Sequence, residues 1–218
     1  NIDQIMSSQL FAEDSKYLSI ASFISKDARV LDIGCGGGQL GAVLREKECV
    51  VDGIDVSLER LVFRKDYNMV WECDIESFEF NQDLGNYDIV VFSDVLEHLV
   101  SAEPILRKIN ILLAHGGRII ISLPNVAFFI NRWNLILGRW DYTDEGILDR
   151  THLKFFTLLT SKRLIEDTGY QIHKIVPQMP IIHSPVKRAI FNFFMNRWPG
   201  IFAIGWIFET SFVSGARS

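Results

Sequence analysis

Short apolar runs alternate with amphipathic segments of helix length between residues 29 and 124. The runs have the length of strands and few polar interruptions, which is typical of strands buried on both faces of a parallel sheet. Right-handed crossovers between such strands give a doubly wound α/β layer with helices on both faces. The expected strands are Arg29–Ile33, Val50–Ile54, Val70–Cys73, Tyr87–Phe92 and Arg118–Leu123, and the expected helices are Gln39–Lys47, Leu58–Lys65 and Ala102–Leu113.

The pattern predicts a single domain over residues 1–218. The alternation breaks after Pro124, and the insertion that follows is expected on the ligand face because it leaves the carboxyl end of a strand. The parts are an N-terminal helical segment (1–28, with helical spacing from Asp3 to Ile24), a ligand-binding core (29–124), a helical cap insertion (125–160) and a C-terminal completion of the sheet (161–218). The last part predicts a helix Ser161–Thr168, a strand Tyr170–Val176, a Phe-rich segment 189–208 and a final strand Glu209–Ala216.

Composition narrows the class of protein. Of 218 residues, 48% are hydrophobic, which is enough for a sizeable core, and the formal net charge of −5 argues against a nucleic-acid partner. Three cysteines without CxxC spacing argue against a disulfide framework and favour a reducing, cytoplasmic location. No signal peptide is expected from the first residues of the sequence. No transmembrane segment is expected either, because the most apolar stretch, Ala189–Phe208, contains Arg197 and Pro199. Its aromatic content indicates a cap, a partner surface or a membrane-surface element, with a packed helix or a homodimer face as alternatives.

A glycine-rich turn follows the first expected strand and opens the first expected helix. Four glycines between residues 34 and 38 allow a tight turn and the close approach of a ligand to the backbone. A dinucleotide site uses the same device, but its G-x-G-x-x-G pattern would need Gly where Gln39 stands. Asp32 would repel a pyrophosphate at the helix N-terminus and suits a ligand with ammonium and sulfonium groups. S-adenosylmethionine carries both and no phosphate, so the turn favours this cofactor over NAD.

Two further acids stand at the ends of expected strands. Asp55 ends the second strand, where Rossmann-like folds place an acid on ribose hydroxyls. Asp74 follows the third strand and suits the amino group of adenine, with Ile75 against the ring. Aspartate is also common in turns, so a turn role for Asp74 stays open.

Five segments together resemble the class I S-adenosylmethionine-dependent methyltransferases, a Rossmann-like family that includes small-molecule methyltransferases. They stand in the order typical of that family. The segments are VLDIGCGGG (30–38), GIDVS (53–57), CDIE (73–76), YDIVVFSDVLEHL (87–99) and GGRIIISLPN (116–125).

The resemblance implies a mostly parallel seven-stranded sheet whose last strand is antiparallel. It also implies roles for individual residues around S-adenosylmethionine. Asp32, Gly34 and Gly36 would line the methionine part with Cys35 beside them, Asp55 would bind the ribose, Asp74 and Ile75 the adenine, Ser93 would contact the cofactor, and Val56 would flank the adenine or belong to the core.

Two histidines are candidate catalytic residues. Methyl transfer is a displacement at a sulfonium carbon, and a base is needed only where the acceptor must lose a proton. His98 lies just past the fourth expected strand in the run LEH, which the resemblance links to small-molecule methyltransferases. His152 lies in the cap among polar and aromatic neighbours. The alternatives are a structural hydrogen bond for His98 and a buried ionic network for His152. No His, Cys or Asp spacing predicts a metal site.

The cap also supplies candidate acceptor-binding residues. These are Asn125, Trp140 and Arg150, where Arg150 would bind an acidic group or pair with Asp149. The stretch ILDRTHLKFFT (147–157) resembles a bacterial methyltransferase subgroup tied to polysaccharide or lipid-carrier pathways, and the aromatic cap favours an amphipathic or lipid-linked acceptor. The sequence therefore predicts methyl transfer to a small molecule, at oxygen, with carbon and nitrogen acceptors open. A non-catalytic cofactor-binding module and an NAD-dependent oxidoreductase are the alternatives from other classes.

Overall fold

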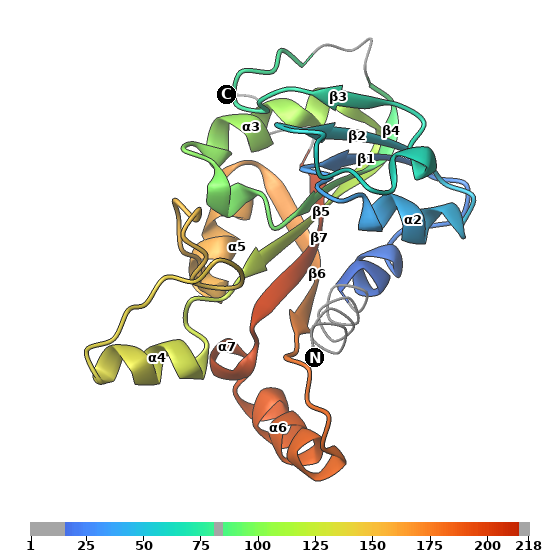
Figure 1. The fold of residues 1–218 in the computed structure, drawn as a ribbon. Helices are drawn as coiled ribbons and strands as arrows, with labels where there is room; N and C mark the ends of the chain where they lie inside the picture. Colours follow the sequence, from blue (N-terminus) through green and yellow to red (C-terminus); the bar gives the residue numbers. More distant parts are fainter. Residues whose placement is uncertain (1–15, 81–84, 214–218) are drawn as a thin grey trace.

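The computed structural model describes residues 16–80 and 85–213, and these form a seven-stranded sheet in the order β3-β2-β1-β4-β5-β7-β6 (Figure 1). Neighbours from β3 to β5 are parallel, and β7 is antiparallel to β5 and β6. This confirms the mostly parallel seven-stranded sheet. The strands are β1 (Arg29–Ile33), β2 (Val50–Asp55), β3 (Val70–Glu72), β4 (Tyr87–Ser93), β5 (Leu113–Pro124), β6 (Tyr170–Gln178) and β7 (Gly205–Phe212).

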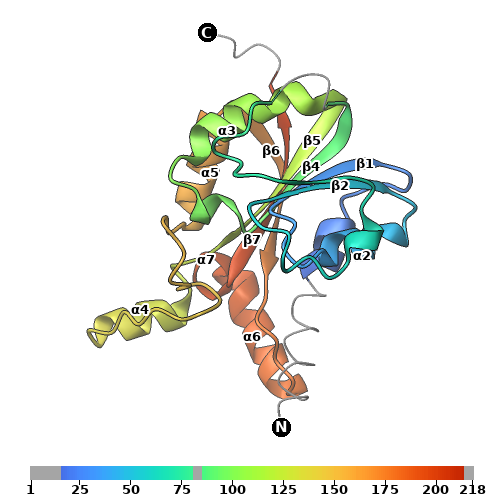
Figure 2. The ribbon, with the colours of Figure 1, turned by 45° about the horizontal axis from the view of Figure 1, so that its top comes forward.

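Helices cover both faces of the sheet (Figures 1 and 2). One face packs against α3 and α5, and the other against α2 and the helical residues 16–21. Within β4, Val90 and Phe92 belong to the first apolar cluster, and Ile89 and Val91 to the second. Alternate side chains point to opposite faces, so burial on both faces explains the unbroken apolar run. The helices are α2 (Gln39–Arg45), α3 (Ala102–Ile109), α4 (Phe129–Ile136), α5 (Leu158–Asp167), α6 (Pro185–Arg197) and α7 (Pro199–Phe202).

The expected helix Leu58–Lys65 is wrong. The segment is a loop that ends in a single 3₁₀ turn at Arg64–Asp66. The backbone N–H groups of Val62 and Phe63 both donate to the carbonyl of Gly37. These bonds hold the loop against the glycine turn. In a helix, the same N–H groups would donate to carbonyls four residues earlier in the segment.

The final strand is displaced from its expected position. β7 runs from Gly205 to Phe212, whereas the sequence predicted Glu209–Ala216, whose end lies outside the described residues. Trp206 and Phe208 were assigned to the Phe-rich segment, but they lie in β7 and are buried. β7 lies between two other strands, and its first residues are apolar, like many residues of the aromatic helical segment before it. The hydrophobic pattern alone therefore did not show where the helix ends and the strand begins.

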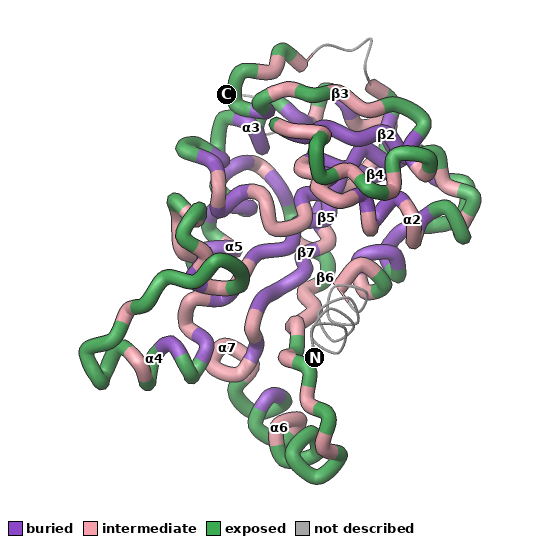
Figure 3. The backbone as a smooth tube through the Cα atoms, in the orientation of Figure 1, coloured by how far each residue is buried: buried purple, intermediate pink, exposed green. Residues whose placement is uncertain are grey.

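Other boundaries differ by smaller amounts. The helix expected from Ala102 to Leu113 ends at Ile109, and β5 already begins at Leu113. Residues 16–21 of the expected N-terminal helix are helical, and its residues 3–15 lie outside the described part. Within the cap insertion 125–160, α4 projects beyond the sheet and is largely exposed (Figure 3).

Candidate functional site

A cavity of about 480 Å³ opens at the carboxyl ends of β1, β2 and β4. Ligands of open α/β sheets bind at this edge, and small-molecule sites span ~300–1,000 Å³. The cavity therefore has the position and size of a cofactor site. Its lining brings together several residues expected from sequence, namely Gly34, Gly36, Asp55, Val56, Asp74, Ile75 and His98.

Hydrogen bonds fix the glycine turn against the end of β2. The N–H of Gly34 donates to the carbonyl of Ile54 at 2.7 Å. The N–H of Gly36 donates to Oδ2 of Asp55 at 2.7 Å, and Oδ1 of Asp55 accepts from the N–H of Ser57 at 3.0 Å. A carboxylate offers about four acceptor positions. Asp55 therefore holds the turn and keeps acceptor capacity for ribose hydroxyls.

Gly34 is required by both its conformation and its surroundings. Its φ is +71°, in the left-handed region that favours glycine. A Cβ at this position would lie 2.5 Å from Cγ2 of Val95, and Val95 lines the cavity. Only glycine lets this turn pack against the cavity wall without displacing it.

The residues expected around the adenine lie at one side of the cavity. Oδ1 of Asp74 accepts the N–H of Glu76 at 2.9 Å, so Asp74 also has the turn role left open by the sequence. Ile75 is buried in the core and lines the cavity. Val56 lines it as well and is 70% exposed, so the core alternative for Val56 is wrong.

Three expected cofactor residues do not line the cavity, namely Cys35, Ser93 and Asp32. Cys35 is buried beside Gly53, and burial raises the pKa of its thiol to about 12, so the thiol stays protonated. Oγ of Ser93 is buried and has no hydrogen-bond partner within the described residues. The neighbouring Asp94 reaches the cavity instead.

The carboxylate of Asp32 faces a tyrosine and does not line the cavity. Asp32 is 2% exposed, and its Oδ2 accepts the hydroxyl proton of Tyr67 at 2.6 Å. Burial raises the pKa of Asp32 to about 7, against the opposing effect of the Tyr67 hydrogen bond. The Asp32 carboxylate is therefore only partly ionised at neutral pH. Its negative charge, on which the choice of S-adenosylmethionine over NAD was based, is correspondingly weakened.

The raised pKa of Asp32 predicts a pH-dependent stability. Native Asp32 binds its proton up to about pH 7, whereas the unfolded side chain releases it near 3.8. Its stabilising contribution is complete below the unfolded pKa and is lost as the pH rises through about 7. Urea unfolding should show that Asp32→Asn gains free energy of unfolding relative to the unsubstituted chain between pH 4 and 8, by on the order of a few kcal/mol. Parallel pH curves for the two proteins would contradict the assignment.

His98 lies where the cofactor cavity meets a second, polar chamber. This chamber has a volume of about 240 Å³, and its lining includes Glu97, Asp149 and His152. His98 lines both spaces, and so does Asp94. The imidazole of His98 therefore lies at the boundary of both spaces.

Hydrogen bonds set the tautomer of His98. Its Nδ1 lies 3.3 Å from the carbonyl of Thr151 and 3.1 Å from Oγ1 of the same residue. The Thr151 hydroxyl donates to Oδ1 of Asp149 at 2.7 Å, so its oxygen accepts from His98. A carbonyl can only accept, so Nδ1 carries a proton. The lone pair of neutral His98 is then on Nε2, which no hydrogen bond engages within the described residues.

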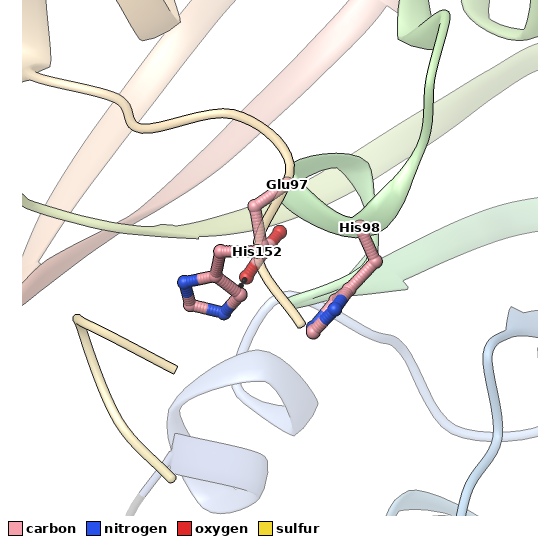
Figure 4. Close-up of side chains that lie close together, drawn as sticks. All are labelled: Glu97, His98 and His152. Atoms are coloured by element: carbon pink, nitrogen blue, oxygen red, sulfur yellow. Dashed lines mark ion pairs between the residues drawn. The ribbon is translucent and has the colours of Figure 1, made fainter. Parts of the chain in front are cut away.

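Glu97 and His152 form a buried pair beside His98 (Figure 4). Nε2 of His152 lies 3.9 Å from Oε1 of Glu97, and Nδ1 of His152 donates to the carbonyl of Ile147 at 3.2 Å. Burial, and then Asp94, raise the pKa of Glu97 well above its ordinary value. Burial, and then His98, lower the pKa of His152. Both shifts favour an uncharged pair.

The ligand atoms of Glu97, His98 and His152 all lie within 4.8 Å of one another. This set could hold a cation. No spacing in the sequence indicated it, because His152 comes from the cap, far along the chain from His98.

Asp94 is a candidate site residue that the sequence did not predict. It lines the cofactor cavity, the polar chamber and a third, mainly apolar cavity of about 440 Å³ near Gln178 and Ile204. Burial alone would raise its pKa, but the ammonium of Lys16 at 2.9 Å and a hydrogen bond from Ser122 outweigh that, so the pKa of Asp94 is lowered. Its φ of +54° is unusual for a residue other than glycine, which is the kind of strain found at functional sites.

The expected acceptor-binding residues lie apart from the polar chamber. Asn125 is buried, and its amide donates to the carbonyls of Gly200 and Ala203. Trp140 packs edge-on against Phe155. Arg150 pairs with Asp144 at 2.7 Å, so of its two expected roles, binding an acidic group and pairing with Asp149, the second is wrong. None of the three lines the cofactor cavity or the polar chamber as the described residues form them.

The chain is similar in sequence to known methyltransferases. A family model described as a methyltransferase domain matches residues 6–175. The Ubiquinone biosynthesis O-methyltransferase of Coxiella burnetii (strain Dugway 5J108-111) is 30% identical over 165 residues, which cover 69% of this chain and 70% of that protein. The protein of the same name from Aeromonas salmonicida (strain A449) is 32% identical over 103 residues, covering 44% of this chain and 43% of that one.

Solved structures share the fold. An S-adenosylmethionine-dependent methyltransferase from Archaeoglobus fulgidus aligns with a TM-score of 0.63 at 21% identity, covering 91% of this chain and 92% of that one. The magnesium protoporphyrin IX methyltransferase of Synechocystis PCC 6803, solved with bound S-adenosylhomocysteine, aligns with a TM-score of 0.61 at 16% identity, covering 92% and 83%.

Proposed function

The chain belongs to the family of S-adenosylmethionine-dependent methyltransferases, and on that premise we propose that it methylates an oxygen atom of a small-molecule acceptor. The observation that carries the choice of oxygen is the position of His98 between the cofactor cavity and the polar chamber, with its lone pair on Nε2. The names of the relatives from Coxiella and Aeromonas support the same atom.

The cavity fits the cofactor. Gly34 and Gly36 carry no side chain, so the methionine part can approach the backbone of the turn closely. A side chain at Gly34 would also meet Val95 in the cavity wall. Asp55 has acceptor capacity for the ribose, and Ile75 offers an apolar surface for adenine, with Asp74 at its edge. When bound, S-adenosylmethionine supplies an electrophilic methyl group on sulfur.

His98 is proposed as the general base. A hydroxyl acceptor must lose its proton as its oxygen attacks, and a positioned base contributes about 10²–10⁴-fold. Nε2 of His98 can take that proton while Nδ1–H stays on Thr151. Burial alone would raise the pKa of Asp149, but hydrogen bonds from Thr151 outweigh it and the pKa is lowered. The Asp149 carboxylate thus holds the Thr151 hydroxyl in the orientation that accepts from Nδ1–H of His98.

His152 is proposed as a positioning residue, not the base. Its Nε2 faces Glu97 at 3.9 Å, and its lowered pKa keeps it neutral. Burial raises the pKa of Glu97 and so favours its protonated form, which can donate a hydrogen bond to an acceptor oxygen in the chamber. The pair thus holds the acceptor without adding charge to a buried site.

Transfer of labelled methyl groups tests the choice of oxygen. The chain is incubated with S-adenosylmethionine labelled in the methyl group and with either octylcatechol or the matched amine octylaniline. We expect a labelled methyl ether from the catechol and at most a trace of labelled product from the amine. Methylation of the amine alone would contradict the proposal, and so would cofactor binding by calorimetry without turnover of either probe. The last result is what a non-catalytic binding module predicts.

The other sequence-based alternatives have less support. Neither the relatives nor the solved structures described above are oxidoreductases, and nothing in them supports an NAD-dependent reaction. Among the described residues, no helix has the length and apolarity needed to cross a membrane. A cytoplasmic location and a homodimer stay predictions.

A further inference from the structure

Two helices project from the same end of the molecule, beyond the sheet (Figures 1 and 2). They are α4 with the residues that follow it (129–140) and α6 with Trp198 (185–198), together called the two-helix surface below. Rings from both helices meet on α7, where Phe202 lies 5.2 Å from Phe129 and 5.3 Å from Phe194, measured between centroids. The start of α4 and the end of α6 are therefore joined through aromatic contacts at α7.

Most apolar side chains of the two-helix surface are exposed. Ile136 is 74% exposed, Phe193 67% and Trp133 61%. Large apolar side chains are rarely clustered on a protein surface unless they contact a partner protein, a ligand or a membrane. The exposed apolar residues of this surface are Phe129, Ile130, Trp133, Leu135, Ile136, Leu137, Val186, Ile190, Phe193, Phe194 and Trp198.

The charge of the two-helix surface is opposite to that of the whole chain. It contains no Asp or Glu, although the chain has 27 acidic residues and a net charge of −5. All of its charged side chains are basic and lie in exposed positions. They are Arg132, Arg139, Lys187, Arg188 and Arg197.

We propose that the two-helix surface docks on an anionic lipid bilayer, with its apolar side chains in the interface and its basic side chains among the headgroups. Apolar residues next to Lys and Arg, with Trp at the boundary, are the composition of helices that lie on membranes. The surface is unsuited to pairing with its own copy, because a twofold interface would bring basic residues together without acids. This proposal does not depend on which acceptor the enzyme methylates.

Flotation of the chain with lipid vesicles tests the proposal. We expect the full chain to float with vesicles of phosphatidylcholine and phosphatidylglycerol, and to float far less with phosphatidylcholine alone or at high salt. The variant Ile136→Glu/Phe193→Glu should lose at least about tenfold in vesicle partitioning, since each change puts a carboxylate in the apolar contact. The variant Arg139→Glu/Lys187→Glu should lose binding to the anionic vesicles.

The matched control is Val50→Glu, which adds a carboxylate at an exposed apolar position at the start of β2. It should float like the unsubstituted chain, and unchanged circular dichroism should show that all variants are folded. Absence of flotation, equal binding to both kinds of vesicle, or flotation that survives both double variants would overturn the proposal. So would a dimer in light scattering that Ile136→Glu/Phe193→Glu dissociates while vesicle binding is absent.

Discussion

Replacement of His98 by Ala is expected to lower kcat for methyl transfer to octylcatechol by about 10²–10⁴-fold, the usual contribution of a positioned base. The affinity for S-adenosylmethionine should change little, because the glycine turn and Asp55 still form the cofactor cavity. Radiolabel transfer gives the rate, and calorimetry gives the cofactor Kd. The combination separates loss of the base from loss of the site.

The matched control for His98 is His115→Ala. His115 is an exposed histidine near the start of β5, away from the carboxyl ends of the strands where the cavity lies. This variant should keep full activity. A His98→Ala enzyme as fast as the unsubstituted chain would remove His98 from the reaction. A larger loss in His152→Ala than in His98→Ala would transfer the role of base to His152.

Replacement of Gly34 by Ala is expected to weaken binding of S-adenosylmethionine by tenfold or more, a free-energy loss of at least about 1.4 kcal/mol. The left-handed backbone alone costs a residue with a Cβ roughly 1–2 kcal/mol. The added methyl group also meets Val95 at 2.5 Å, so either the turn or the wall of the cavity must move. Isothermal titration with the cofactor measures the effect, and thermal unfolding reports the stability.

Gly116→Ala separates these two causes. Gly116 has a φ of +79° and no atom within 4 Å of its missing Cβ, and it lies near the opposite end of strand β5 from the cavity. Gly116→Ala should lose stability through its backbone and keep its cofactor affinity. Equal cofactor affinity in the two variants would show that the Gly34 turn does not shape the cofactor site.

Much of the lining of the cofactor cavity could be predicted because its information is local. The glycine turn lies between one strand and one helix, and Asp55 and Asp74 stand at strand ends that a parallel sheet brings to one edge. Asp32 shows the limit of this reasoning. The sequence placed Asp32 correctly within the motif. It did not indicate that the carboxylate binds Tyr67, because Tyr67 lies between the expected elements, in a segment for which no structure was predicted.

The proposed acceptor site depends on contacts between distant parts of the chain. His98 and His152 lie with their ring centroids 4.7 Å apart, although α3, β5 and much of the cap insertion stand between them in sequence. Asp94 looked like part of a strand-end motif, and only the fold shows that it borders three cavities. The hydrophobic pattern cannot predict these contacts, because they depend on how the cap insertion packs against the residues that follow β4.

The most direct test of His98 as the base compares two acceptors that differ in acidity. Methyl transfer by the unsubstituted chain and by His98→Ala is measured in single turnovers with octylcatechol and with its nitro-substituted counterpart, which ionises without help. We predict that the rate deficit of His98→Ala is large with octylcatechol and nearly vanishes with the nitro compound, because that acceptor needs no base. An equal deficit with both acceptors would contradict proton removal by His98.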